Sequence, residues 1–191
     1  MSKGVLSIVA TPIGNLGDIT FRAVETLRQA DAIACEDTRV SSKLLARYDI
    51  QKPLLIFHAR SGRLASERIL ALLAEGKRVA LVTDAGTPGI SDPGNELVRE
   101  VRNRLPGEVS IEAIAGPSAL TAALSIAGAP THEFLFLGFL PHKKGRQTLF
   151  KEIASETRAV VFYESPHRIE KALASLAGVL SEGRKVTVAR E

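Results

Sequence analysis

Several residue types are scarce in this sequence of 191 residues, and each scarcity excludes a class of protein. A single cysteine, Cys35, cannot form an internal disulfide, so we exclude a disulfide framework and expect a reducing cytosol. Tryptophan is absent and tyrosine occurs twice, which leaves few rings to stack on a flat macrocycle. The four histidines are scattered and the cysteine has no partner, so the sequence predicts no metal site.

No uncharged stretch has the length and continuity of a membrane span. Residues 5–10 are too few for the apolar region of a signal peptide, and residues 113–130 are interrupted by Gly116 and Pro117. We interpret residues 113–130 as the end of a strand followed by a buried helix. Net charge +4 and a sequence pI of about 9.4 allow an anionic partner without requiring one.

Two common nucleotide-binding fingerprints are also missing. Only Gly14 and Gly17 follow the first apolar run, so G-x-G-x-x-G is absent and a dinucleotide-binding dehydrogenase is disfavoured. The segment Thr83–Gly94, TDAGTPGISDPG, contains no Lys or Arg, which disfavours a phosphate cradle. Its glycines, prolines and two aspartates predict a stiff acidic loop suited to ribose hydroxyls, an amino group or a cationic ligand. A simple cluster of surface turns is the alternative.

Short β-branched runs alternate with amphipathic helical patterns, which is typical of βαβ units around a parallel sheet. We expect strands at residues 5–10, 31–35, 54–58, 78–83 and 109–114. Loops at residues 12–17, 84–94 and 116–119 each follow one of these strands, so they are expected to meet at one edge of the sheet around a common cleft. Residues 134–140 and 159–163 predict two further strands, and residues 186–189 the start of another.

The helix expected at about residues 20–30 has Phe21, Val24 and Leu27 spaced to share one face. A second helix, at residues 64–74, has Ile69 and Leu73 directed inward, and Gly76 follows its end as a C-cap. These patterns predict helices packed against the sheet.

Six motifs occur in order along the chain: Pro12-Ile13-Gly14-Asn15-Leu16, Glu36-Asp37-Thr38-Arg39, Asp84 to Gly94, Gly116-Pro117-Ser118-Ala119, Gly138-Phe139-Leu140-Pro141 and Tyr163-Glu164-Ser165-Pro166-His167-Arg168. Together they closely resemble the bacterial ribosomal RNA small subunit methyltransferase I family of the tetrapyrrole methylase superfamily, over essentially the whole chain. The resemblance implies 2′-O-methylation of a cytidine in 16S rRNA of the small ribosomal subunit, with S-adenosylmethionine as the methyl donor.

The same resemblance implies a tetrapyrrole methylase-like α/β fold of two domains, residues 1–118 and 119–191, with the cofactor in the cleft between them. It also implies a cytoplasmic homodimer, and we expect neither a membrane nor a DNA partner. Relative to the family, the second domain is expected to be incomplete at its C-terminal end, where further strands would follow.

The resemblance further implies which residues bind the cofactor. They are Pro12, Ile13 and Gly14 through their backbone, Asp84 and Thr87 from the acidic loop, Ser118 and Ala119 at a helix start, and Tyr163 from the second domain. An acidic loop without lysine suits a cofactor that carries a cationic sulfonium and ribose hydroxyls.

A ribose hydroxyl is a poor nucleophile, so a nearby acceptor should help to remove its proton. Asp37 is the first candidate, followed by Glu36 and Glu164, each at an expected strand end. The alternative is that Glu36 and Asp37 form a structural ion-pair and cap cluster with Arg39. His58 and His167 are weaker candidates for the same role.

Lys143, Lys144 and Arg146, with Arg168 further along, form the basic patch expected to contact the RNA backbone. The alternative is a solvated loop that aids solubility. Two other functions stay open: a methylase of a small tetrapyrrole-like molecule, and a truncated form that binds cofactor or RNA without turnover.

Overall fold

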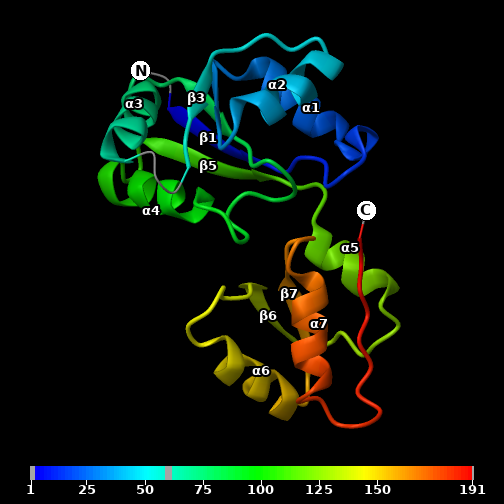
Figure 1. The fold of residues 1–191 in the computed structure, drawn as a ribbon. Helices are drawn as coiled ribbons and strands as arrows, with labels where there is room; N and C mark the ends of the chain where they lie inside the picture. The colour runs from blue at the N-terminus through cyan, green and yellow to red at the C-terminus, as the bar shows by residue number, and fades with distance from the viewer. Residues whose placement is uncertain (1–2, 59–61, 191) are drawn as a thin grey trace. The chain divides into compact units, whose positions relative to one another are not determined.

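The computed structural model describes residues 3–58 and 62–190, and the chain divides into two compact units (Figure 1). The first unit extends to Ala119, and the second runs from Leu120 to Arg190. The boundary expected from the sequence, between residues 118 and 119, lies one residue away from this division. That each unit folds as an independent domain stays a prediction.

The first unit is built on a five-stranded sheet in the order β3-β2-β4-β1-β5, and every pairing in it is parallel. The strands are β1 (Gly4–Val9), β2 (Ala32–Cys35), β3 (Leu54–Ile56), β4 (Arg78–Leu81) and β5 (Val109–Ile114). Because strands in a parallel sheet are covered on both faces, their sequences are near-continuous apolar runs, as those of β2 and β4 are. The expected α/β fold with a mainly parallel sheet is confirmed.

Two pairs of helices cover the two faces of this sheet (Figure 1). The helices are α1 (Phe21–Gln29), α2 (Thr38–Arg47), α3 (Gly62–Ala74) and α4 (Gly94–Arg104), and a short 3₁₀ helix, η1 (Leu16–Asp18), precedes α1. Leu6, Val79 and Leu81 pack under α3 and α4, whereas Ala80 and Val82 pack under α1 and α2. Successive side chains of a strand therefore enter opposite layers, as the pleat requires.

The prediction that Phe21 shares the inward face of its helix with Val24 and Leu27 is wrong. Val24 and Leu27 are buried, but the Phe21 side chain is 98% exposed. Thr20 is the N-cap and its hydroxyl accepts a hydrogen bond from the Ala23 N–H, so Phe21 occupies the first helical position. Helical side chains lean toward the N-terminus, and at this position there is no preceding turn to cover the ring.

The second unit contains α5 (Ala119–Ile126), β6 (Phe134–Phe139), α6 (Arg146–Ser155), β7 (Ala159–Tyr163) and α7 (Ile169–Ala177). Strands β6 and β7 pair in parallel. Its core is a single cluster formed by Leu140, Phe150, Ile153, Ala172 and Leu176. No helix in the described ranges has the length and apolar character that would let it cross a membrane.

Two predictions for the second unit are wrong. Helix α5 has no buried residue, although it was expected to be a buried helix, because an apolar composition alone does not show how many neighbours surround a helix. Residues 186–189 form no strand, and Val186 and Val188 are about half exposed. A β pattern needs a partner strand within reach, and the described residues offer none there.

Candidate functional site

The three glycine-bearing loops meet at the carboxyl edge of the sheet in the first unit. Thr11, just after β1, exchanges two backbone hydrogen bonds with Gly86: the Thr11 N–H donates at 2.8 Å and the Gly86 N–H donates back at 3.1 Å. The Thr11 hydroxyl also donates to the Thr83 carbonyl at 3.0 Å. The Thr87 hydroxyl donates to the Pro117 carbonyl at 3.1 Å, which joins the third loop. The expectation that these loops share one edge is confirmed.

The acidic loop Thr83–Gly94 is held closed by Asp92. Its carboxylate accepts the Gly89 N–H at 2.8 Å and the Gly94 N–H at 2.7 Å. Gly86 and Gly89 both have positive φ, which glycine adopts without the steric penalty of a Cβ atom. At Gly94 a Cβ atom would lie 2.8 Å from the Gly89 nitrogen. Hydrogen bonds and close backbone packing thus constrain the loop, and its stiffness stays a prediction.

Glu36 follows β2 and lies beside this loop, because β2 and β4 are neighbours in the sheet. The Thr83 hydroxyl donates to its carboxylate. Burial raises the pKa of Glu36, although this hydrogen bond opposes the shift. A carboxylate with a raised pKa accepts a proton more readily, so Glu36 has the chemistry of a general base.

Asp37, the first candidate acceptor, is engaged by its own neighbours. Its carboxylate accepts the Arg39 backbone N–H at 2.8 Å as the N-cap of α2, and it pairs with the Arg39 guanidinium at 2.6 Å. Hydrogen bonds from Arg39 hold the pKa of Asp37 at about 2, which makes it a weak base. The Asp37 N–H donates to the Asp84 carboxylate at 3.2 Å. This geometry favours the structural alternative for Asp37.

The expected cofactor contacts of the first unit gather around the same edge. Asp84 and Gly14 are exposed, Ile13, Thr87 and Ser118 are half-buried, and Pro12 is buried, with Ala119 exposed at the start of α5. Exposed carboxylate and main-chain groups, with no cation in the acidic loop, suit a ligand with a sulfonium and ribose hydroxyls. The donor set present here fits S-adenosylmethionine.

In the second unit, Glu164 is the centre of a buried ion cluster. Its side chain is 1% exposed, and its carboxylate pairs with Arg168 at 2.6 Å and with Arg146 at 3.1 Å. The Ser165 N–H adds a third hydrogen bond at 2.8 Å. Arg146 also donates to the Pro141 carbonyl at 2.9 Å. These contacts tie the segment at residues 141–146 to the segment at residues 164–168.

This cluster argues against two expectations from the sequence. Glu164 is covered by its partners, which leaves it poorly placed to take a proton from a substrate. Arg146 and Arg168, with 13% and 22% of their side chains exposed, pair with Glu164, which disfavours their contact with RNA, and that contact stays a prediction. Lys143 and Lys144 are exposed, and their contact with RNA stays a prediction.

Sequence reasoning missed an aromatic cluster on one face of β6 and β7. The Tyr163 ring lies 5.1 Å from Phe136, edge to face, and 5.4 Å from Phe139, measured between centroids. Burial raises the pKa of Tyr163. The signal was the apolar and aromatic run at residues 134–140, but alternation alone would place Phe136 and Phe139 on opposite faces, and the register shift of β6 between them brings both rings to Tyr163.

A family model described as Tetrapyrrole (Corrin/Porphyrin) Methylases matches residues 5–191. A protein of Thermotoga maritima named Ribosomal RNA small subunit methyltransferase I is 47% identical over 98% of this chain and 83% of its own length. A Synechocystis protein with the same name is 48% identical over 98% of this chain and 67% of its own. The crystal structure of the methyltransferase CobJ superposes with a TM-score of 0.69 at 23% identity, over 95% of this chain and 78% of that one, which shows the fold.

Proposed function

We propose that this chain, which belongs to the tetrapyrrole (corrin/porphyrin) methylase family, is an S-adenosylmethionine-dependent methyltransferase of ribosomal RNA of the small subunit. The observation that carries the proposal is the meeting of the three loops over an acidic edge, in a chain 47% identical to a relative named for this activity. The finer assignment is 2′-O-methylation of a cytidine in 16S rRNA by a cytoplasmic homodimer.

When bound, S-adenosylmethionine supplies a methyl group on a positively charged sulfur. The residues that would hold it in the first unit are Pro12, Ile13, Gly14, Asp84, Thr87, Ser118 and Ala119. Asp92 and the reciprocal Thr11–Gly86 bonds keep that edge in shape before the cofactor arrives. Correct positioning of the reactants can lower an activation barrier by roughly 7–11 kcal/mol. A well-ordered sheet edge that positions the cofactor therefore contributes to catalysis. The role of Tyr163 in cofactor binding stays a prediction from the resemblance.

Glu36 is our choice for the group that takes the proton from the ribose hydroxyl. Its pKa is raised by burial, whereas Arg39 makes the Asp37 carboxylate a weak base. The Thr83 hydroxyl orients the Glu36 carboxylate at the strand end. Asp37 then serves to start α2 and to present its N–H to Asp84.

Lys143 and Lys144 supply the positive charge that we assign to RNA contact in the second unit. Replacing both by alanine should weaken RNA binding and reduce the slope of log affinity against log salt by about 0.7–0.9 for each phosphate that is no longer neutralised. Filter binding at several salt concentrations measures this slope. If the slope of log affinity against log salt is unchanged, the two lysines belong to a solvated loop that does not contact RNA.

A methylase of a small flat molecule is the second candidate function, because Phe136, Phe139 and Tyr163 present three rings on one face of β6 and β7. Titration calorimetry with S-adenosylmethionine, followed by transfer of a tritiated methyl group to purified small ribosomal subunits or to a tetrapyrrole, separates the two functions. Label in the rRNA supports the proposal, and label in the tetrapyrrole alone refutes it. Cofactor binding without transfer to either would indicate a form that does not turn over.

A further inference from the structure

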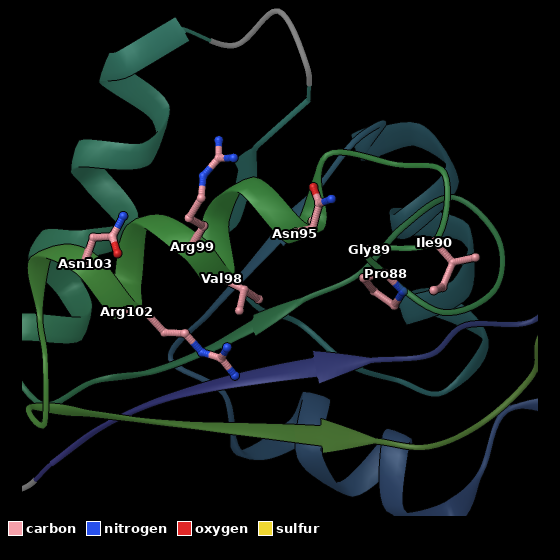
Figure 2. A pocket seen from close by; sticks show the side chains of 9 residues that line it. Pro88, Gly89, Ile90, Asn95, Val98, Arg99, Arg102 and Asn103 are labelled. Carbon is pink, nitrogen blue, oxygen red and sulfur yellow. The ribbon is translucent and has the colours of Figure 1, made fainter. Parts of the chain in front are cut away.

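A pocket of about 410 Å³ lies on the first unit between α4 and the outer half of the acidic loop (Figure 2). The loop contributes Pro88, Gly89, Ile90 and Gly94, and α4 contributes Asn95, Val98, Arg99, Arg102 and Asn103. Its volume lies in the range of small-ligand sites. None of these nine residues is acidic. The pocket therefore combines an aliphatic floor with a cationic and amide rim.

The polar residues of this rim form one stripe along α4. Asn95, Arg99 and Asn103 follow one another at intervals of four residues, and Arg102 lies three residues after Arg99, so all four lie on one broad side of the helix. All four are exposed, while Val98 between them is half-buried. Figure 2 shows the Arg99 and Arg102 side chains leaving α4 in opposite directions, with Val98 on the same side as Arg102. The two guanidinium groups are thus separated from each other, and one of them lies beside an apolar contact point.

The acids of α4 lie on a separate stripe. Glu96, Glu100 and Arg104 follow one another at intervals of four residues, and Arg104 pairs with Glu67 of α3 at 2.8 Å. Arg99 and Arg102, by contrast, make no ion pair or hydrogen bond within residues 3–58 and 62–190. Exposed arginines without a partner are available to an external anion.

We propose that this pocket binds one nucleotide of the RNA substrate, next to the nucleotide that is methylated, so the inference rests on the proposed function. The base lies on Val98, Pro88 and Ile90. Arg99 and Arg102 contact the two phosphates that flank the nucleotide, one on each side. The amides of Asn95 and Asn103, which both donate and accept hydrogen bonds, read the polar edge of the base.

The shape and charge of the pocket favour this occupant over a free anion or an apolar peptide. A single phosphate would need converging cations, whereas Arg99 and Arg102 leave α4 in opposite directions in Figure 2. An apolar partner would leave two guanidinium groups and two amides without hydrogen bonds, which is unfavourable on burial. A nucleotide within a strand satisfies all four polar groups and covers the aliphatic floor.

The pocket also shares its loop with the cofactor edge. Residues 88–90 line the pocket, while Asp84 and Thr87 of the same loop are among the expected cofactor contacts. The Asp92 carboxylate binds the N–H groups of both Gly89 and Gly94, which line the pocket. A nucleotide held here is thus positioned by the same segment that would position the methyl donor.

The test compares the 191-residue chain with three double variants by fluorescence anisotropy, using a labelled single-stranded oligonucleotide of small-subunit rRNA. Arg99→Gln with Arg102→Gln should weaken binding about tenfold or more and lower the salt slope by about 1.4, because single-stranded RNA gives about 0.7 per phosphate. Asn95→Ala with Asn103→Ala should weaken binding about threefold to tenfold at an unchanged salt slope.

The matched control is Lys43→Gln with Arg47→Gln on α2, which removes the same charge from the same unit. It should leave affinity within about twofold of the parent chain, because long-range charge effects are screened by salt. All variants should bind S-adenosylmethionine as the parent does, which shows that the acidic loop is folded. If the control variant loses as much RNA affinity as the arginine variant, the loss comes from net charge and the pocket inference is refuted.

Three other results would overturn the inference. The arginine variant can bind RNA as the parent does; the asparagine variant can show no loss; or the arginine variant can change its sedimentation coefficient, which makes the pocket a contact between copies of the chain. If the parent chain methylates small subunits and any of these three results is obtained with the variants, the proposed function stands and the nucleotide pocket is refuted. A parent that binds RNA in the expected pattern but transfers no methyl group keeps the pocket and loses the proposed function.

Discussion

Replacing Glu164 by glutamine separates a structural role from a catalytic one. The carboxylate is 1% exposed and joins two guanidinium groups and a backbone N–H. Removing one partner from a buried ion pair costs about 3–5 kcal/mol. Arg146 and Arg168 retain 13% and 22% exposure and can recover some solvation, so we expect a loss near the lower limit, about 3 kcal/mol.

The chain provides its own probe for this measurement. It has no tryptophan and two tyrosines, Tyr48 in the first unit and Tyr163 in the second. In a Tyr48→Phe background, tyrosine fluorescence during urea unfolding reports the second unit alone. Glu156→Gln, which removes a pair with Arg158, whose side chain is 45% exposed, is the matched control and should lower the urea midpoint much less than Glu164→Gln does. A Glu164→Gln variant as stable as the parent, but unable to transfer a methyl group, would refute the structural role.

Three further predictions concern the acidic edge. Asp84→Ala should weaken S-adenosylmethionine binding about tenfold in calorimetry, as expected for one lost hydrogen bond to a charged group, and unchanged affinity would make the loop a scaffold. Glu36→Gln should raise the urea midpoint at pH 7. Because the pKa of Glu36 is raised in the folded state, ionisation of this carboxyl opposes folding as pH rises through that pKa, and glutamine cannot ionise. The increase in urea midpoint should therefore disappear below the ordinary glutamate pKa of about 4.3. Gly94→Ala should cost about 1–3 kcal/mol by urea unfolding, because its Cβ would lie 2.8 Å from the Gly89 nitrogen, whereas Gly178→Ala has 3.6 Å to the nearest atom and should be near neutral.

Local patterns predicted most elements of the first unit. The expected strand at residues 109–114 matches β5, and Gly76 follows α3 with φ +80° as a C-cap. Cys35, which lies in an apolar run of the sequence, is fully buried. The meeting of the three loops was predictable too, because strand ends in a parallel sheet share an edge.

Features that depend on contacts across the chain were not predictable. Phe21 has the spacing of a buried residue, but its position at the first turn of α1 leaves it in solvent. The sequence shows Glu164 only as an acid at a strand end. Its pairing with Arg146, 18 residues earlier, depends on the fold. The stripe of Arg99 and Arg102 becomes a pocket only because the acidic loop folds back beside α4.

The position of β1 in the sheet sets a constraint on synthesis. Residues 4–9 are made before both of their partner strands, because β1 lies between β4 and β5, whose first residues are Arg78 and Val109. At about 5–20 residues per second, β1 waits about 4–15 s after its own synthesis before β4 exists to pair with it. During that interval an apolar segment of the nascent chain has no partner strand. β1 therefore completes its hydrogen bonds in the sheet only after β5 has also been made.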